Sequence, residues 1–376
     1  MLNRSSGASA FYEGIDFIRS AAVFLVLWSH GSSLLPPQNH LFLYSQFFRP
    51  GFWGVTLFFS ISGFLIIGQL FDMACGRRDE SLRVFVLRRC LRTMPAYWLA
   101  SGLVLLLGIA AWPGSVTFVA NLLFVQNLAS VGSVLPVAWS LVIEVWSYML
   151  FAFLAWVSNC LEGRAWLLNR WFSRVRSQES LLLLSLVVLP VIASLIRFDW
   201  AVQGVSVQQI KQGLAPQLDA LAYGGILAWL QRSRPSLFDR LARLSWLAPV
   251  CLVLMALATS SAPFLFASVH LPVPRMAAGW LAFGFYPCVG LLASLFLLSL
   301  WNFRYRWLPC RMDLLCRSLS QCSYSVYLLH LGVASVLAPL GIGFAPFFLY
   351  LLASILVGAL GWRWMERPFT RLRYVL

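Results

Sequence analysis

Ten apolar runs, each about as long as a membrane span, constrain this chain more than any other feature. A helix that crosses a bilayer needs about 20 consecutive apolar residues, and helices are the usual way to satisfy the backbone there. Of the residues, 60% are hydrophobic and 11% charged, whereas soluble domains have about 25% charged residues. We therefore predict an all-α polytopic membrane protein forming one integral-membrane domain, residues 1–376. Its spans lie near 15–35, 52–71, 94–111, 135–157, 181–197, 213–231, 245–261, 278–300, 319–340 and 344–363.

The distribution of basic residues predicts how the chain threads through the membrane. With a cytoplasmic N-terminus, all but four of the 28 lysines and arginines fall on the inner side, the exceptions being Arg49, Arg197, Lys211 and Arg275. Short cytoplasmic loops carry such an excess of basic residues, so the net charge of +15 needs no nucleic-acid partner. We predict about ten transmembrane helices with both termini cytoplasmic.

One more apolar segment, residues 116–128, is too short and too polar to be a span. It carries Asn121, Gln126 and Asn127, and an eleventh span here would invert every later loop against the charge rule. We predict an interfacial or re-entrant piece. None of the eight cysteines lies in a predicted outer loop, and no cysteine or histidine spacing fits a metal. We therefore expect no structural disulfide and no metal site.

His30 is the first polar residue that a membrane span should not contain. An ionisable side chain inside a span costs roughly 2.5–3.5 kcal/mol even on lenient scales, so each one is a functional hypothesis. His30 follows Arg19 by eleven residues, which brings both onto one helix face about 16 Å apart. Asp16, three residues before Arg19, is placed to pair with it. The alternative is a histidine hydrogen-bonded in the bundle core.

Glu144 is the second such residue, in the fourth predicted span. If that span begins near Val137, Glu144 lies a few residues below the outer surface, at a depth comparable to that of His30. A carboxylate beside a histidine fixes its tautomer and favours the protonated ring that forms in general-base catalysis. The alternative is an interfacial carboxylate turned to water.

Two further polar groups lie within spans. His330, in the ninth span, is either a third polar wall or a core histidine, and we expect a structural or substrate-orienting role. Ser60, Ser62 and Gly63 form a patch of small residues in the second span. Small residues allow helices to approach closely, and direct contact with a substrate is the other interpretation.

Three arginines, Arg88, Arg89 and Arg92, precede the third span on the cytoplasmic side. The positive-inside rule explains basic residues at this position. Three guanidinium groups within about one turn also suit a phosphate-rich ligand, because guanidinium binds phosphate through two hydrogen bonds.

Six segments, in order along nearly the whole chain, resemble acyltransferase family 3, whose members are membrane-bound O-acyltransferases of bacterial glycans, Nod factors and macrolides. In that family an arginine precedes an essential histidine by eleven positions, as Arg19 precedes His30. The chain departs from the family where Val145 and Trp146 follow Glu144 in place of polar residues. The six segments are IDFIRSAAVFLVLWSH, GVTLFFSISGFLI, RRCLRTMPAYW, WSLVIEVWSYML, SYSVYLLH and WMERPFTRL.

The resemblance implies an acyl-CoA dependent O-acyltransferase of the bacterial inner membrane. Acyl-CoA, most simply acetyl-CoA, would be a co-substrate held from the cytoplasm, with no permanently bound cofactor. The acceptor would be a hydroxyl of a cell-surface glycan or glycolipid on the outer side. The resemblance assigns catalysis to His30 and Glu144, CoA binding to Arg19, Arg88, Arg89 and Arg92, and substrate or structural support to Asp16, Ser60, Ser62, Trp139, Ser140 and His330.

Two mechanisms and two other functions stay open at this point. Direct transfer and a covalent acyl-histidine both fit, and we hypothesise direct transfer because one base suffices for a reactive thioester. A transporter or flippase of a lipid-linked or acylated sugar predicts discontinuous helices and often a repeat, and the sequence has no internal repeat. A glycan polymerase usually places its catalytic groups in a large outer loop, and none is predicted here.

Overall fold

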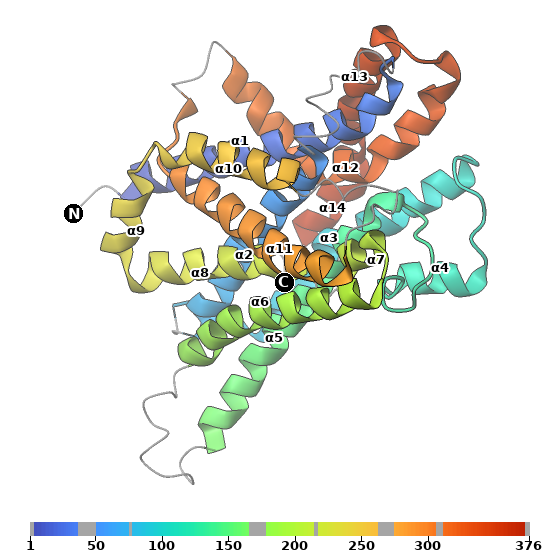
Figure 1. Ribbon diagram of the computed structural model, residues 1–376. Coiled ribbons are helices and arrows are strands. Elements are labelled where there is room, and N and C mark those ends of the chain that lie inside the picture. The colour runs from blue at the N-terminus through green and yellow to red at the C-terminus, as the bar shows by residue number, and fades with distance from the viewer. Residues whose placement is uncertain are drawn as a thin grey trace.

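The protein folds into a bundle of long helices (Figure 1), seen in a computed structural model that describes residues 4–36, 50–74, 77–164, 178–213, 217–261, 274–305 and 311–372. These residues contain no β-strand. The long helices are α1 (Arg4–Gly31), α2 (Pro50–Ala74), α3 (Leu82–Leu106), α5 (Trp139–Arg164), α6 (Gln178–Gln203), α8 (Asp219–Ser233), α10 (Leu247–Ser261), α11 (Arg275–Ser299), α12 (Met312–Leu337) and α13 (Phe344–Gly361).

Short helical elements connect or extend the long ones. They are η1 (Ser32–Leu34), α4 (Ser115–Leu122), η4 (Pro136–Ala138), α7 (Val207–Gln212), α9 (Pro235–Ala242), η10 (Ala338–Leu340), the π-helical turn η11 (Trp362–Glu366) and α14 (Arg367–Leu372). Helix α2 lies in the middle of the bundle. Helices α6, α8 and α11 pack together on one side of it, and α1, α12 and α13 pack together on the other (Figure 1).

Each predicted span overlaps one of the long helices, which confirms the all-α membrane fold. Six of these helices, α2, α5, α6, α11, α12 and α13, are long and apolar enough to cross a bilayer, and the bent pair of α9 and α10 adds a seventh if it counts as one span. Helix α8 has only 15 residues, and the first half of α3 is rich in arginine. The number of ten spans and the cytoplasmic termini stay predictions.

The polar segment 116–128 forms the eight-residue helix α4 and a loop, so it is too short to span a membrane. Its Asn121 is buried and serves as a tie: its side-chain oxygen accepts hydrogen bonds from the Tyr97 hydroxyl and the Val134 amide, both at 2.9 Å. This segment lies against the start of α5, where the Trp146 ring nitrogen donates to the Phe124 carbonyl at 2.6 Å.

Two glycines let α2 and α8 touch through their backbones. A Cβ atom on Gly63 would lie 2.0 Å from the Leu221 carbonyl oxygen, and one on Gly224 would lie 2.1 Å from that of Ser60. No larger residue fits at such distances, so the crossing depends on both glycines. The Ser60 hydroxyl, 3.1 Å from that of Ser294, ties α2 to α11. Gly63 and Ser60 therefore serve helix packing, as one of the two interpretations expected.

A buried ion pair joins α6 to α8. Arg197, counted by the charge rule as lying outside the membrane, is fully buried, and its guanidinium lies 2.7 Å from the Asp219 carboxylate. The same guanidinium donates to the Ala282 carbonyl and the Ser194 hydroxyl. Leaving a charge unpaired in the bundle would be costly, so this arginine is explained by structure.

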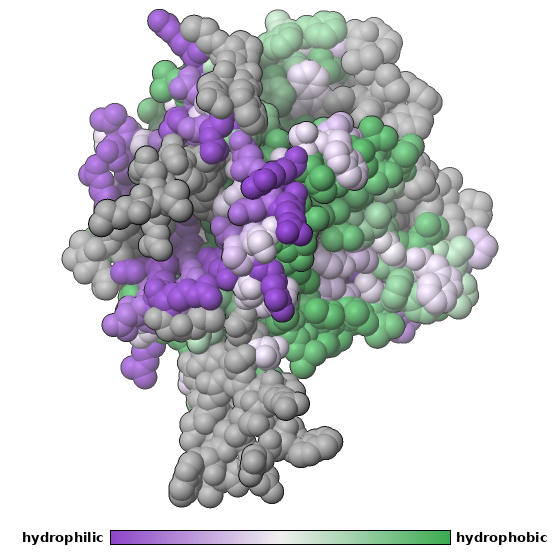
Figure 2. Space-filling model, turned by 90° about the vertical axis from the view of Figure 1, so that its left-hand side faces the viewer, coloured by the Kyte–Doolittle hydropathy of each residue, from purple (hydrophilic) through white to green (hydrophobic). Residues whose placement is uncertain are grey.

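The surface separates by polarity. On the face shown in Figure 2, hydrophilic residues gather on one side and hydrophobic residues on the other. Large apolar side chains are exposed along α6, α10 and α13, among them Leu184, Val253 and Leu352. Such a surface is expected of helices that face lipid.

Candidate functional site

An arginine-lined cavity of about 470 Å³ opens between α1, α2, α3 and α5. It contains all four arginines that the sequence suggested for binding a phosphate-rich ligand, and Arg78 as a fifth. The other lining residues are Ser62, Leu65, Ile66, Gln69, Glu144 and Tyr148.

The five arginines differ in how far the protein already satisfies them. Arg78 and Arg88 both contact the Glu80 carboxylate at 2.6 Å, and Arg89 donates to the Gln69 side-chain oxygen at 2.6 Å. Among the described residues, Arg19 and Arg92 form no hydrogen bond or ion pair. Each guanidinium offers five donors, so these two are the groups most available to an anion.

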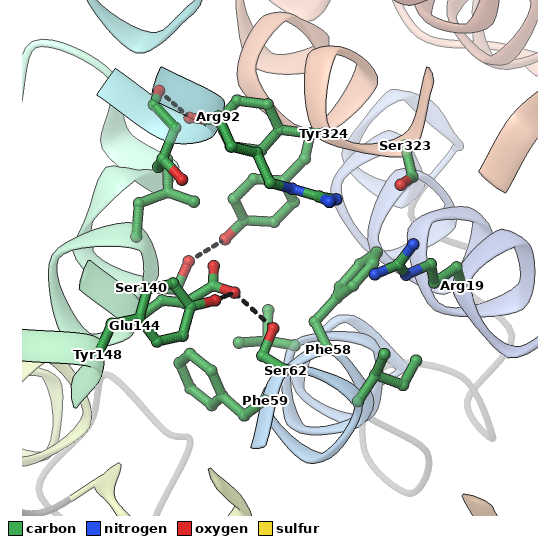
Figure 3. A pocket seen from close by; sticks show the side chains of 15 residues that line it. Arg19, Phe58, Phe59, Ser62, Arg92, Ser140, Glu144, Tyr148, Ser323 and Tyr324 are labelled. Carbon is green, nitrogen blue, oxygen red and sulfur yellow. Dashed lines mark hydrogen bonds between the residues drawn. The ribbon is translucent and has the colours of Figure 1, made fainter. Parts of the chain in front are cut away.

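The cavity continues past Arg19 and Arg92 into a narrow space of about 80 Å³ (Figure 3). Arg19 and Glu144 enter this space from opposite walls, on α1 and α5. Arg19, Ser62, Arg92, Glu144 and Tyr148 line both parts, so the two adjoin, and together they are called the passage below. The narrow part is also lined by Val55, Phe58, Phe59, Ile61, Thr93, Ser140, Leu141, Ser323, Tyr324 and Tyr327.

A hydrogen bond joins two residues that line the narrow part of the passage. The hydroxyls of Ser140 and Tyr327 lie 2.7 Å apart, and the Tyr327 hydroxyl also donates to the Val137 carbonyl at 3.2 Å. Ser140 of the WSL segment is thus a structural part of the site. Its neighbour Trp139 lies under the Lys211 ammonium, which is 5.2 Å from the ring centroid.

Glu144 does not hydrogen-bond to His30, which corrects the prediction that the two form a catalytic pair. The Ser62 and Tyr148 hydroxyls both donate to its carboxylate, which faces the arginines. Helix α5 begins inside the protein, because Val137 and Ala138, which directly precede it, are buried. The depth of Glu144 in the membrane stays a prediction.

His30 instead meets His330, where α1 and α12 run side by side. The Nε2 atom of His330 lies 3.2 Å from Nδ1 of His30. His330 is fully buried, and its Nδ1 lies 2.8 Å from the Tyr327 carbonyl. His30 is exposed, and its Nδ1 also lies 3.1 Å from the Val26 carbonyl.

These contacts determine the tautomers of the neutral rings. A carbonyl can only accept, so Nδ1 of His330 carries the proton and its Nε2 has the lone pair. Nδ1 of His30 must then donate, shared between His330 and the Val26 carbonyl. The Nε2 atom of His30 keeps its lone pair, as a general base requires.

Asp16 does not form the predicted ion pair with Arg19, because Ser320 is a closer partner. The Ser320 hydroxyl donates to the Asp16 carboxylate at 2.7 Å. This bond and the contact between His30 and His330 both join α1 to α12.

The tyrosines of the site were missed in the sequence. Tyr148 and Tyr327 carry a spacing signal, because Tyr148 follows Glu144 by four residues and Tyr327 precedes His330 by three, so each shares a helix face with its partner. Tyr324 donates to the Thr93 carbonyl at 2.7 Å. This contact joins α12 to α3, and no local sequence pattern predicts it.

The fold defines a multi-pass membrane protein whose helices enclose an arginine-lined cavity. Residues 12–363 match the sequence model of a family described as an acyltransferase domain, and the chain belongs to this family, acyltransferase family 3. No curated protein and no solved structure matches the chain significantly.

Proposed function

We propose that the protein is a membrane O-acyltransferase that moves an acyl group, most simply acetyl, from cytoplasmic acyl-CoA to a hydroxyl of a cell-surface glycan or glycolipid on the outer side of the bacterial inner membrane. The observation that carries this proposal is the passage from the arginine-lined cavity to Tyr327, which lies one helical turn before His330.

The arginines would hold the phosphates of the donor. Arg19 and Arg92 have no partner among the described residues, and an incoming phosphate would supply one through charge-assisted hydrogen bonds. Arg78, Arg88 and Arg89, which the protein already satisfies in part, would add to the positive field at the entrance. The thin pantetheine arm would then follow the narrow part of the passage.

The histidine pair would supply the base. Nε2 of His30 takes the proton of the acceptor hydroxyl while the hydroxyl oxygen attacks the thioester carbonyl. The carbon–sulfur bond breaks, and the CoA thiolate takes the proton from the His30 imidazolium, which leaves an ester and free CoA. His330 is a positioning residue, because its Nε2 accepts the Nδ1–H of His30 before and after the proton transfer.

In this proposal, the hydrogen bond between Ser140 and Tyr327, 2.7 Å long, would separate the passage from the histidines. For transfer to occur, the Tyr327 ring must move so that the thioester reaches His30. The bond between two neutral hydroxyls is worth about 0.5–1.5 kcal/mol, so donor binding can supply the free energy for this opening.

The test is acyl transfer in inverted membrane vesicles, which expose the cytoplasmic side. Acetyl-CoA labelled in the acetyl group is added, and label is measured in the glycan and lipid fractions. We expect His30→Ala to lose about 10²–10⁴-fold of the activity while it still binds CoA in a thermal-shift assay. Equal labelling by wild type and His30→Ala would contradict the proposal, and export of a sugar without labelling would indicate a transporter.

A further inference from the structure

A second polar cavity, of about 530 Å³, lies near the start of α5, between the loop after α4, the end of α6 and helix α7. In Figure 1 these elements lie side by side on the right. The volume falls within the range of about 300–1,000 Å³ that is typical of ligand pockets. The residues that bear on its chemistry are Gln126, Asn127, Ser130, Trp200, Gln208 and Gln212.

The lining of this amide-lined cavity contains no charged side chain among the described residues. It consists mainly of amide, hydroxyl and backbone groups, which both donate and accept hydrogen bonds. An anion placed here would lose its hydration without meeting a cation among the lining residues. The cavity is therefore suited to a ligand that is neutral and rich in hydroxyl groups.

Gln126 carries hydrogen-bonding capacity that the protein leaves unused. Its side chain is fully buried, and neither its oxygen nor its nitrogen has a hydrogen-bond partner among the described residues. The hydroxyl of Tyr97, which donates to the Asn121 side-chain oxygen at 2.9 Å, is the polar group nearby that also interacts with Gln126. A buried amide without a partner is costly, and a hydroxyl-bearing ligand in the cavity would remove that cost.

Trp200 provides an apolar wall in the same cavity. It is half-buried near the end of α6, so part of a flat, rigid ring faces the space. A pyranose ring has faces of C–H groups and an edge of hydroxyls. An aromatic wall together with several amides matches both parts of such a ring, whereas an acyl chain would leave the amides without partners.

One wall of the cavity is tied to the start of α5 and to α7. The Asn127 side-chain nitrogen donates to the carbonyls of Trp139 and Gln212, at 3.0 and 2.8 Å, which fixes the wall in place. Lys211, next to Gln212, lies over the Trp139 ring and within electrostatic range of His30.

We propose that the amide-lined cavity binds the acceptor, and that the acceptor segment it binds is an uncharged carbohydrate. The acceptor role rests on the proposed function, but the binding of carbohydrate does not. The sugar would lie with one ring face on Trp200 and its hydroxyls on the amides, with one hydroxyl directed toward His30.

The experiment measures binding of the full-length protein, purified in lipid nanodiscs, to an array of oligosaccharides. The array contains uncharged bacterial-type oligosaccharides and matched ones that carry uronate or phosphate. We expect wild type to bind members of the uncharged set, and Trp200→Ala and Gln212→Ala to weaken that binding by about tenfold. The matched control is Trp246→Ala, an exposed tryptophan outside the cavity, which should bind as wild type does.

Three outcomes would overturn the inference: wild type that binds no uncharged oligosaccharide, binding restricted to charged ones, or equal binding by Trp200→Ala and wild type. A thermal unfolding midpoint equal to that of wild type shows that each variant is folded. Carbohydrate binding without acyl transfer would refute the proposed function and leave the site standing. Acyl transfer with an acceptor KM unchanged by Trp200→Ala would support the proposed function and refute the carbohydrate site.

Discussion

The arginine-lined cavity and the amide-lined cavity are both polar spaces in one apolar bundle, yet they differ in charge. The first collects five arginines and a single carboxylate, and two of its guanidiniums have no partner among the described residues. The second has no charged lining residue in the part of the chain that the structure describes, and its excess capacity lies in amides.

The difference indicates what each space receives. A cation inside a membrane protein is costly unless an anion neutralises it. The guanidinium groups of Arg19 and Arg92, which form no hydrogen bond or ion pair among the described residues, can therefore bind an anion. An amide without a hydrogen-bond partner needs no charged ligand, because a neutral hydroxyl can both donate to it and accept from it. In the proposed function, charge would select the donor and neutral polarity would select the acceptor.

The largest effect is expected at the histidine pair. His330→Ala removes the acceptor for the Nδ1–H of His30 and should lower kcat by about 10²–10⁴-fold, since loss of an orienting partner in a comparable triad costs about 10⁴. The KM values for acyl-CoA and acceptor should stay as in wild type. The side-chain oxygen of His330→Gln can accept the same bond, so this variant should recover part of kcat. A rise in both KM values in His330→Ala would indicate a purely structural role.

Arg92→Ala should weaken the binding of acyl-CoA without affecting the acceptor. A hydrogen bond to a charged group is worth about 1.5–3 kcal/mol, so the KM for acyl-CoA should rise about 10–150-fold while the acceptor KM is unchanged. Steady-state kinetics at saturating acceptor measure this. Arg83→Ala is the control, because Arg83 lies on the same helix but is exposed and outside the cavity. Equal effects in both variants would contradict a specific phosphate site.

Glu144→Gln separates the two roles that have been assigned to Glu144. The amide keeps an oxygen for Ser62 and Tyr148 but removes a negative charge opposite Arg19. An anionic donor should then bind about three- to tenfold more tightly, with kcat changed less than tenfold. A loss in kcat near 10⁴ would instead restore the carboxylate as the partner of His30.

Ser140→Ala should produce the smallest effect. It removes one neutral hydrogen bond from the Tyr327 hydroxyl but leaves the one to Val137. We expect the ratio of acyl-CoA hydrolysis to acyl transfer to rise about two- to fivefold, because the barrier between donor and histidines opens more often. Release of free CoA with and without acceptor measures the ratio, and an unchanged ratio would show that the bond does not control access.

Local patterns in the sequence predicted the parts of the site that depend on helical phase. Arg88, Arg89 and Arg92 lie within about one turn, and the structure places them in one cavity with Arg19. The long helices follow equally from runs of about 20 apolar residues. The family, too, could be recognised from segments of the sequence, and the match over residues 12–363 confirms it.

Contacts between distant helices could not be predicted in the same way. The depth of Glu144 was estimated from where its span begins, but that start is buried inside the protein. His30 and His330 are 300 positions apart, and their contact depends on how far α12 rises beside α1. Likewise, Arg197 was assigned to the outside because Asp219, its partner on another helix, gave no local signal.

The narrow part of the passage has a consequence for the energy supply of the cell. The space of about 80 Å³, lined by Phe58, Phe59 and Tyr327, is much smaller than the arginine-lined cavity of about 470 Å³. An open tunnel wide enough for a whole nucleotide would dissipate the gradient that drives ATP synthesis. In the proposed function, this constriction would let a bond be exchanged between the two compartments while they stay electrically insulated from each other.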